Sequence, residues 1–441
     1  MTRADVGIIG GGIAGLTLGC RYQKTDRSVV VLEASERPGG IIETYREGDW
    51  TVELGPSTVR LTDELRKLLS EIGLLSKVQY PDESAKKRFI VRKGKLKALP
   101  MGPLSLLKGG ALSSSLVFKL IRERAMGSGQ LPADEPLSQL IRRRFGQEVV
   151  DYALNPFVAG VFAGDPDELS ARFAFPKLYQ HLDQHGSILK GFMAEAKARK
   201  RAGKAKISIF TLQDGLERLP QRLAEELGND LHYRQNVTHI QQIPEGWQVQ
   251  TTTGRTYVFK RLINTLPLPQ TLNILHDSAL QHALHELPDI CHPPMAMVAL
   301  GYSANAFDTN PSGFGFLVPK KEKARILGGI YASSLFPDRA PPGCALINVF
   351  IGGVRQPELA DMSEQQHIAL AHNELVRLLG VRHQPVFHVR KTWQQAIPQY
   401  GLKHGELLLK LEDIERRFPE YRLLGNYRSG VGVPDRASIE R

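Results

Sequence analysis

The chain has 441 residues, of which 42% are hydrophobic and 23% are charged, a composition that is typical of globular proteins and argues against disorder. Its formal net charge of +11 is compatible with nucleic acid, an anionic membrane surface or an acidic substrate as partner. The three cysteines, Cys20, Cys291 and Cys344, lie far apart. Because they form neither a disulfide framework nor a metal-binding pattern, we expect a reducing compartment.

No apolar export signal precedes the first predicted strand. The most apolar stretch, residues 104–120, is interrupted by lysines and serines, so it is not the run of about eighteen apolar residues that a membrane span requires. We therefore expect the mature chain to start at or near Met1 and not to cross a membrane.

The first predicted unit is a strand, a tight turn and a helix. Residues 6–15 are V-G-I-I-G-G-G-I-A-G, in which Gly10, Gly12 and Gly15 have the G-x-G-x-x-G spacing. This spacing allows a tight turn, brings a pyrophosphate close to the backbone at a helix N-terminus and lets the helix pack on the strand. The next apolar strand ends at Glu33, a position where a carboxylate accepts hydrogen bonds from ribose hydroxyls and disfavours NADP. A glycine fingerprint alone can be an ordinary strand-to-helix turn. Here the strand before it, the helix after it and the acid at the expected distance together favour dinucleotide binding.

The stretch that follows distinguishes FAD from NAD. Residues 33–40, E-A-S-E-R-P-G-G, resemble the second FAD segment of the flavin amine oxidase superfamily. Residues 50–57, W-T-V-E-L-G-P-S, resemble its next signature, a loop that passes close to the flavin ring. The resemblance implies that Arg37 lies beside the pyrophosphate, whereas an arginine taken alone is expected on the surface.

The middle of the chain predicts a hairpin followed by helices. Residues 88–100 are typical of two short strands around a Lys-Gly turn, and residues 103–206 are mostly helical in pattern. The helices have basic polar faces, which fit either an anionic membrane surface or a solvated face of a packed domain. Basic clusters without neighbouring aromatic residues make nucleic acid the least favoured partner.

A narrower resemblance comes from residues 160–170, G-V-F-A-G-D-P-D-E-L-S, and from Phe175-Pro176. They are similar to segments of the protoporphyrinogen oxidase family, as are residues 210–219, 313–319, 327–337 and 397–400. The resemblance implies FAD-dependent, six-electron oxidation of protoporphyrinogen IX to protoporphyrin IX in haem biosynthesis, with hydride transfer to flavin N5 and oxygen reduced to hydrogen peroxide. A respiratory quinone remains an alternative acceptor.

The fold implied is α/β with α+β. We expect a discontinuous, Rossmann-type FAD-binding domain, a mixed-sheet substrate domain and a helical membrane-associated domain. The predicted boundaries are residues 1–86, 207–266 and 387–441 for the FAD-binding domain, 87–100 and 267–386 for the substrate domain, and 101–206 for the helical domain.

The resemblance also implies site residues. Arg88 would pair with a substrate propionate, and Gly315, Leu317, Ile330 and Phe350 would line apolar walls, although Leu317 and Ile330 taken alone are ordinary core residues. The implied FAD contacts are Gly10, Gly11, Gly12, Ile13, Ala14, Gly15, Glu33, Ala34, Arg37, Gly40, Gly55, Pro56, Ser57, Thr58, Val237, Trp393, Gly425, Val431, Gly432 and Val433.

No catalytic acid or base is assigned, because hydride transfer to a flavin does not require one. His181 and His185 are four residues apart, but we expect no metal site because a third ligand is missing. The C-terminal residues 423–435 resemble the last FAD signature, in which a helix N-terminus points at the flavin. Arg436 stands where the family usually has cysteine, and the helix after Pro434 is expected to be short.

Three alternatives stay open at this stage. The first is coproporphyrinogen III oxidase forming coproporphyrin III, whose four propionates would favour several cations. The second is an amine oxidase or carotenoid desaturase, and the third is a flavin-binding protein without turnover. We expect a cytoplasmic protein on the inner face of the membrane with a tetrapyrrole substrate, compatible with handover to ferrochelatase and with a homodimer.

Overall fold

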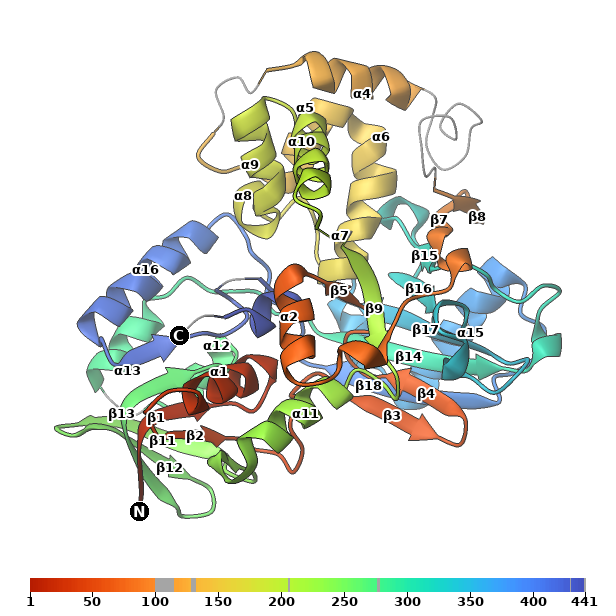
Figure 1. Cartoon of the computed structure of the whole chain (residues 1–441). Coiled ribbons are helices and arrows are strands. Elements are labelled where there is room, and N and C mark those ends of the chain that lie inside the picture. The colour runs from red at the N-terminus through yellow and green to blue at the C-terminus, as the bar shows by residue number, and fades with distance from the viewer. Residues whose placement is uncertain (100–114, 128–131, 205–206, 276–277, 429, 440–441) are drawn as a thin grey trace.

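The protein is seen in a computed structural model that describes residues 1–99, 115–127, 132–204, 207–275, 278–428 and 430–439. Two seven-stranded sheets lie side by side, and a group of helices lies above them in the view of Figure 1. The chain passes between these parts several times, so each is built from segments distant in sequence.

The first sheet contains the predicted glycine turn. Its central strand β1 is parallel to β2 on one side and to β13 on the other. Val29 and Val31 of β2 face one apolar core, and Val30 and Leu32 face another, as in a parallel sheet covered by helices on both sides. In spatial order the strands are β10 (Leu231–His232), β2 (Val29–Leu32), β1 (Thr2–Ile9), β13 (Thr256–Asn264), β12 (Gly246–Thr251) and β11 (Val237–Ile243), and β19 (Tyr421–Leu423) also pairs with β13.

Helices bury both faces of this sheet. Those that share the core of Val29 are α1 (Ile13–Gln23), α2 (Asp63–Glu71), α11 (Arg218–Leu227) and α17 (Val433–Ala437). Those that share the core of Val30 are α12 (Leu268–Asn273), α13 (Ser278–His285) and α16 (His404–Arg417). The short α17 confirms that the C-terminal helix is little more than one turn long.

The second sheet is mixed, as predicted. The predicted hairpin is present as β7 and β8, and its turn residues Lys93 and Gly94 both have positive φ, 54° and 70°, which suits a two-residue hairpin turn. β7 then pairs in parallel with β15, while the other neighbours are antiparallel. In spatial order the strands are β18 (Phe387–Trp393), β14 (Met295–Tyr302), β17 (Ala345–Gly352), β16 (Gly328–Tyr331), β15 (Gly315–Leu317), β7 (Arg88–Arg92) and β8 (Lys95–Ala98).

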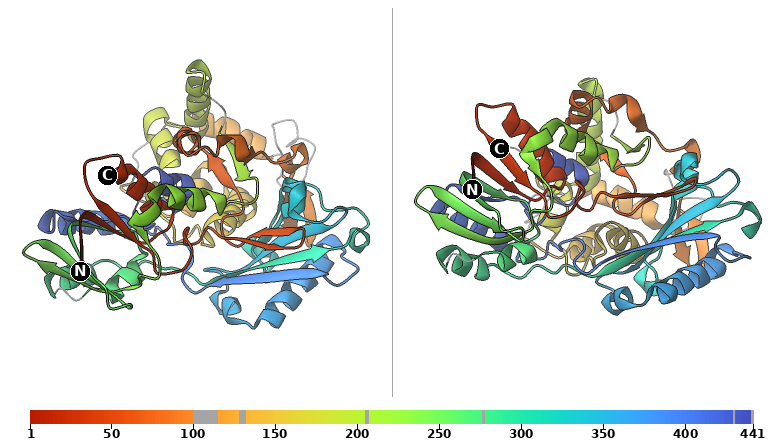
Figure 2. Two further views of the ribbon diagram at one scale, coloured as in Figure 1. Left: turned by 60° about the horizontal axis from the view of Figure 1, so that its bottom comes forward. Right: turned by 90° about the horizontal axis from the view of Figure 1, so that it is seen from below.

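The two faces of the second sheet are covered differently. Helix α15 (Glu364–Leu379) packs on one face. The ribbon of β3 (Thr44–Glu47) and β4 (Trp50–Glu53) packs on the other, and Figure 2 shows the orange ribbon and the blue helix on opposite sides. A three-stranded sheet of β5 (Val59–Leu61), β9 (Ser208–Leu212) and β6 (Val78–Gln79) packs on the core of the first sheet.

The helical group has its own apolar core, and most of it belongs to the predicted helical domain. Residues 101–114, 128–131 and 205–206 of that domain lie outside the described residues. The helices are α4 (Ser115–Ala125), α5 (Leu137–Phe145), α6 (Gln147–Val149), α7 (Asn155–Phe162), α8 (Ala171–Ala174), α9 (Pro176–His185) and α10 (Ile188–Arg201), with a π-helical turn at Val150–Leu154. The remaining short elements are α14 (Ala332–Leu335) and the 3₁₀ turns Leu75–Lys77, Glu83–Lys86, Gly228–Asp230, Ala304–Ala306, Lys320–Glu322, Pro337–Arg339 and Pro357–Asp361.

The structure corrects three of the predicted boundaries. β18 was placed in the FAD-binding domain, but it pairs with β14 at the edge of the second sheet. Helices α12 and α13 were placed in the substrate domain, but their leucines complete the core of the first sheet. The ribbon β3–β4 lies within residues 1–86 but packs on the second sheet. In each case a contact distant in sequence decides the position, and local pattern does not reveal it.

A buried ion pair between Arg339 and Glu53 connects the β3–β4 ribbon with the turn that follows α14. Arg339 is 3% exposed, its Nη2 lies 3.4 Å from Glu53 Oε1, and it donates hydrogen bonds to Thr211 Oγ1 and Leu212 O. Burial raises the pKa of Glu53 even beside this guanidinium. Through the ion pair and these hydrogen bonds, Arg339 therefore links β4 and β9 to the turn that follows α14.

We expect Arg339→Met to lower the free energy of unfolding by about 3–5 kcal/mol, because it leaves the Glu53 carboxylate buried without its cation. The double variant Arg339→Met/Glu53→Gln should recover part of this loss. Arg382→Met is the matched control, since its ion pair with Asp308 is exposed and should matter little. Urea unfolding of the three variants tests this, and equal losses in Arg339→Met and Arg382→Met would contradict it.

Candidate active site

The glycine turn forms a cradle that is closed on one side and open on the other. A Cβ added at Gly15 would lie 1.9 Å from Gly10 O, so only glycine lets α1 start this close to β1. At Gly12 an added Cβ would meet nothing within 4 Å. A second glycine loop lies alongside, because Gly39 N donates to Gly11 O at 2.8 Å and Gly40 approaches Gly12. Backbone groups of two loops therefore surround the open space beside Gly12. Such a space suits a pyrophosphate.

Glu33 connects the end of β2 to this turn. Its Oε2 accepts a hydrogen bond from Gly11 N at 2.7 Å, and its Oε1 accepts from Ser35 N at 2.8 Å and Ser35 Oγ at 2.7 Å. A carboxylate has about four acceptor positions, so one remains for a ribose hydroxyl. Glu33 therefore has two roles, holding the turn and presenting an acceptor.

Arg37 is held by its own loop. Its guanidinium donates to Gly40 O at 2.8 Å, Ile42 O at 3.1 Å and Glu43 Oε2 at 3.0 Å. Lys391 of β18 donates to the same Glu43 oxygen at 2.6 Å, so this network joins the FAD loop to the second sheet. Contact between Arg37 and a pyrophosphate stays a prediction, and Lys391 is a residue that the sequence did not indicate.

The expected flavin segments contain buried polar atoms without partners. Ser57 Oγ and Asn426 Oδ1 are buried and have no hydrogen-bond partner among the described residues, which is costly unless a ligand supplies one. A Cβ at Gly55 would lie 2.0 Å from Ile41 O, so the loop needs glycine there. Trp393 ends β18 opposite Met295. Together with the open cradle at Gly12, these features fit a bound FAD.

The remaining predicted contacts are distributed over the first sheet and the C-terminal segment. Val237 is buried at the start of β11, and Gly425 lies against Leu266 O and the Tyr427 ring. Val431 packs against the core of the helical group, just before Gly432 N donates to Asp435 Oδ2 at 3.0 Å. Thr265, missed by the sequence analysis, donates through Oγ1 to Ile9 O at 2.8 Å beside the glycine turn.

All five predicted substrate residues lie in neighbouring strands of the second sheet. Gly315 pairs with Arg88 on one side and with Ile330 on the other, and Gly328 pairs with both Leu317 and Phe350. Their side chains face away from α15, since the alternate residues of these strands pack under α15. A Cβ at Gly160 would lie 2.5 Å from Leu317 Cδ2, so α7 of the helical group covers part of this face.

Arg88 stands at the exposed edge of this apolar face. Its guanidinium carbon lies 4.7 Å from the centre of the Phe314 ring, and its side chain is exposed. The structure thus brings the five residues together, while their contact with a substrate stays a prediction.

No three His, Cys, Asp or Glu side chains within the described ranges are arranged to hold a metal ion. His181 is buried, and its Nε2 lies 3.2 Å from Glu195 Oε2. His181 therefore makes an ordinary helix-to-helix contact with α10, whereas His185 is exposed.

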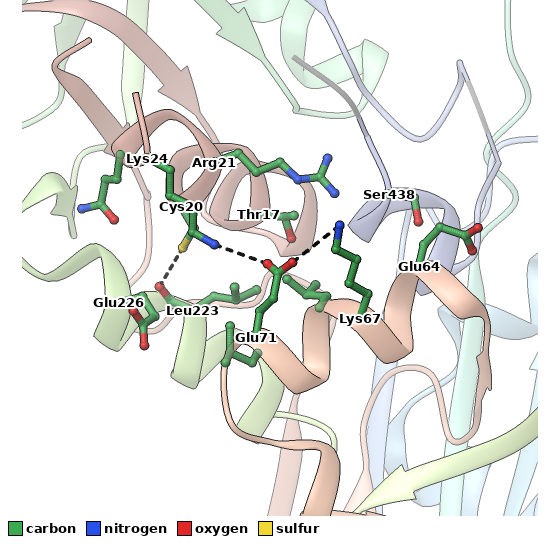
Figure 3. A pocket seen from close by; sticks show the side chains of 13 residues that line it. Thr17, Cys20, Arg21, Lys24, Glu64, Lys67, Glu71, Leu223, Glu226 and Ser438 are labelled. Carbon is green, nitrogen blue, oxygen red and sulfur yellow. Dashed lines mark hydrogen bonds and ion pairs between the residues drawn. The ribbon is translucent and has the colours of Figure 1, made fainter. Parts of the chain in front are cut away.

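A pocket of about 680 Å³ lies between α1, α2, α11 and the end of α17 (Figure 3). Lys24 reaches Glu71 from the end of α1, and Lys67 pairs with the same carboxylate along α2. Burial raises the pKa of the Cys20 thiol in its wall to about 12, so this thiol stays protonated and is a poor nucleophile. None of the predicted cofactor or substrate residues lines this pocket.

Comparison with known proteins agrees with this geometry. The family model for flavin-containing amine oxidoreductases matches residues 13–433. The chain belongs to this family. It is 32% identical to human protoporphyrinogen oxidase over 97% of this chain and 95% of that one, and 29% identical to protoporphyrinogen oxidase 2 of Arabidopsis thaliana over 97% and 90%. It is also 25% identical to coproporphyrinogen III oxidase of Bacillus subtilis (strain 168) over 98% and 95%.

A solved structure from Exiguobacterium sp. 255-15, provisionally assigned as a protoporphyrinogen oxidase, has a TM-score of 0.80 at 23% identity over 99% of this chain and 96% of that one. This likeness shows the flavin amine oxidase type of fold. Family membership makes the protein an oxidoreductase with FAD as its cofactor.

We expect Gly12→Val to abolish FAD binding while leaving the apoprotein as stable as the wild type. Gly12 has φ −73° and ψ 176°, which any residue adopts. A Cβ there would meet no protein atom within 4 Å, but it would occupy the space of a bound pyrophosphate. Gly15→Ala should instead destabilise the apoprotein, because its Cβ meets Gly10 O. Thermal unfolding and FAD titration of both apoproteins measure this; wild-type FAD affinity in Gly12→Val would remove the cradle from the cofactor site.

Proposed function

We propose that this protein oxidises protoporphyrinogen IX to protoporphyrin IX. The observation that carries the proposal is the apolar sheet face formed by Leu317, Ile330 and Phe350, with the cation Arg88 at its exposed edge. A tetrapyrrole with apolar rings and two propionates fits such a surface, in which apolar walls bind the rings and a cation binds a carboxylate.

The residues of this chain bind and orient, and no acid or base among them is needed. When bound, FAD supplies a hydride acceptor, so the protein holds the carbon to be oxidised near it and excludes competing reactions. The apolar face and α7 keep water from the reacting carbon, while Arg88 sets the position of the macrocycle. We propose oxygen as the final acceptor, reduced to hydrogen peroxide in each of three two-electron oxidations.

Coproporphyrinogen III is the second candidate substrate, and one observation favours it. Lys86 and Lys87 precede Arg88, and all three side chains are exposed at the start of the hairpin. Several cations together would suit a substrate with four propionates. The Bacillus subtilis relative named as coproporphyrinogen III oxidase is consistent with this alternative.

Mixing the FAD-loaded protein with each porphyrinogen and following porphyrin fluorescence, with and without oxygen, tests the function. We expect faster oxidation of protoporphyrinogen and a requirement for oxygen in steady turnover. Faster oxidation of coproporphyrinogen would assign the protein to the second candidate. No oxidation of either compound would contradict the proposal.

Arg88→Ala should raise KM by about tenfold to a hundredfold with a smaller change in kcat. Charge-assisted hydrogen bonds contribute about 1.5–3 kcal/mol, and a propionate far from the reacting carbon is bound equally in ground and transition states. Arg88→Lys should restore only part of the loss, because lysine cannot form two parallel hydrogen bonds.

Lys95→Ala is the control for this series, since Lys95 is an exposed cation on the adjacent strand β8. Steady-state kinetics with an unchanged flavin spectrum distinguish the variants. A wild-type KM in Arg88→Ala would place Arg88 outside the substrate site.

We also propose that the helical group attaches the protein to the inner face of an anionic membrane, with the rest of the chain in the cytoplasm. On α4, Phe118 is 71% and Ile121 is 62% exposed, beside the exposed Arg122 and Arg124. This pattern fits a helix lying in a membrane surface. No helix among the described residues is long and apolar enough to cross a membrane. Handover to ferrochelatase and a homodimer stay predictions.

The double variant Phe118→Ser/Ile121→Ser should weaken sedimentation with anionic vesicles, because it removes the apolar part of the contact. Binding should also weaken with salt, since each basic residue near such a surface contributes about 1 kcal/mol. Leu409→Ser is the control, because Leu409 is 67% exposed on α16 of the first-sheet domain. Equal sedimentation of wild type and double variant would contradict the membrane proposal.

A further inference from the structure

Tyr400 lies between β18 and α16 and is 4% exposed. Its hydroxyl makes two hydrogen bonds to the C-terminal FAD segment: it donates to Asn426 O and accepts from Gly430 N at 3.0 Å. These two backbone groups lie four residues apart along the segment that carries the predicted contacts Gly425 and Val431. One side chain therefore fixes two points of this segment, at Asn426 and at Gly430.

The backbone around Tyr400 connects the same point to the helical group. Tyr400 O accepts a hydrogen bond from Ser170 N at 2.8 Å, and Gln399 Nε2 donates to Phe162 O at 2.8 Å. Phe162 ends α7, the helix whose Gly160 lies against Leu317. Residues 399–400 thus contact the FAD segment on one side and, on the other, the helical group whose α7 covers part of the substrate face.

The ring of Tyr400 is itself held in place. It stacks on His404 with ring centres 4.1 Å apart and an interplanar angle of 18°. His404 is 4% exposed and also contacts Phe173. Burial lowers the pKa of His404 to about 4, so the imidazole is neutral at ordinary pH and the stack does not carry a buried charge.

We propose that Tyr400 is a positioning residue for FAD, whose hydroxyl holds the backbone of Asn426 and Gly430 in the position that binds the cofactor. A loop that is already ordered loses less conformational freedom on binding, which strengthens affinity. The inference rests on the proposed placement of FAD beside Gly425 and residues 431–433, and it adds a residue that does not itself contact the cofactor.

Tyr400→Phe is the direct test, because it keeps the ring and the His404 stack and removes only the hydroxyl. Tyr302→Phe is the matched control: Tyr302 is equally buried, and its hydroxyl lies 3.0 Å from His372 Nδ1 under α15. Titrating each apoprotein with FAD and following flavin fluorescence gives Kd. We expect Kd to rise about tenfold in Tyr400→Phe, equivalent to about 1.4 kcal/mol, and to stay at the wild-type value in Tyr302→Phe.

Kinetics at saturating FAD should show kcat and KM near wild type in Tyr400→Phe, because the residue acts through cofactor binding. Equal Kd values in the two variants would overturn the inference while leaving the FAD site in place. A wild-type apoprotein that does not take up FAD would overturn the cofactor site itself.

Amide hydrogen exchange of the wild-type apoprotein gives a second test that needs no variant. If Tyr400 orders the loop before FAD binds, the Gly430 amide should exchange slowly without FAD, as slowly as the Ser170 amide that donates to Tyr400 O. Rapid exchange at Gly430 alongside protection at Ser170 would overturn the inference.

Discussion

The close approach of α1 to the end of β1 is the contact on which the rest of the structure depends. Gly15 allows it, because any side chain there would collide with Gly10 O. The contact fixes the glycine turn, and two other parts of the chain then reach the turn, through Glu33 and Gly39 of one segment and through Thr265 of another. A discontinuous domain is the result, since each of these segments must return to the same edge of the first sheet.

The second sheet supplies the proposed substrate side of the site, because its two faces are covered differently. Strand alternation gives it two apolar faces, and α15 covers only one. The opposite face is shared by the ribbon β3–β4, by α7 and by the residues we propose for the substrate. The Glu53–Arg339 pair and the Arg37–Glu43–Lys391 network hold this face at a fixed position relative to the FAD cradle. These contacts between domains therefore keep the proposed substrate face in a fixed position relative to the proposed cofactor site.

The parts of the fold that depend on local sequence could be predicted, and the parts that depend on distant contacts could not. The turn around Gly10–Gly15 and the hairpin turn at Lys93-Gly94 follow from residue type and spacing. The position of β18 depends on hydrogen bonds to β14, and that of α12 on an uncovered sheet face. The loop contacts of Arg37 and the hydroxyl of Tyr400 were missed for the same reason, because their partners are fixed by the folded backbone.

The central claim is that a porphyrinogen bound on the second sheet gives up hydride directly to the FAD held by the first. Anaerobic mixing of the FAD-loaded protein with excess protoporphyrinogen tests this most directly, because each protein molecule can then react only through its own cofactor. The account predicts loss of the oxidised flavin's visible absorption without oxygen, because one FAD accepts the two electrons of the first of the three oxidations, and porphyrin fluorescence once oxygen is admitted. Flavin absorption that stays constant, in protein shown to retain its FAD, would contradict it.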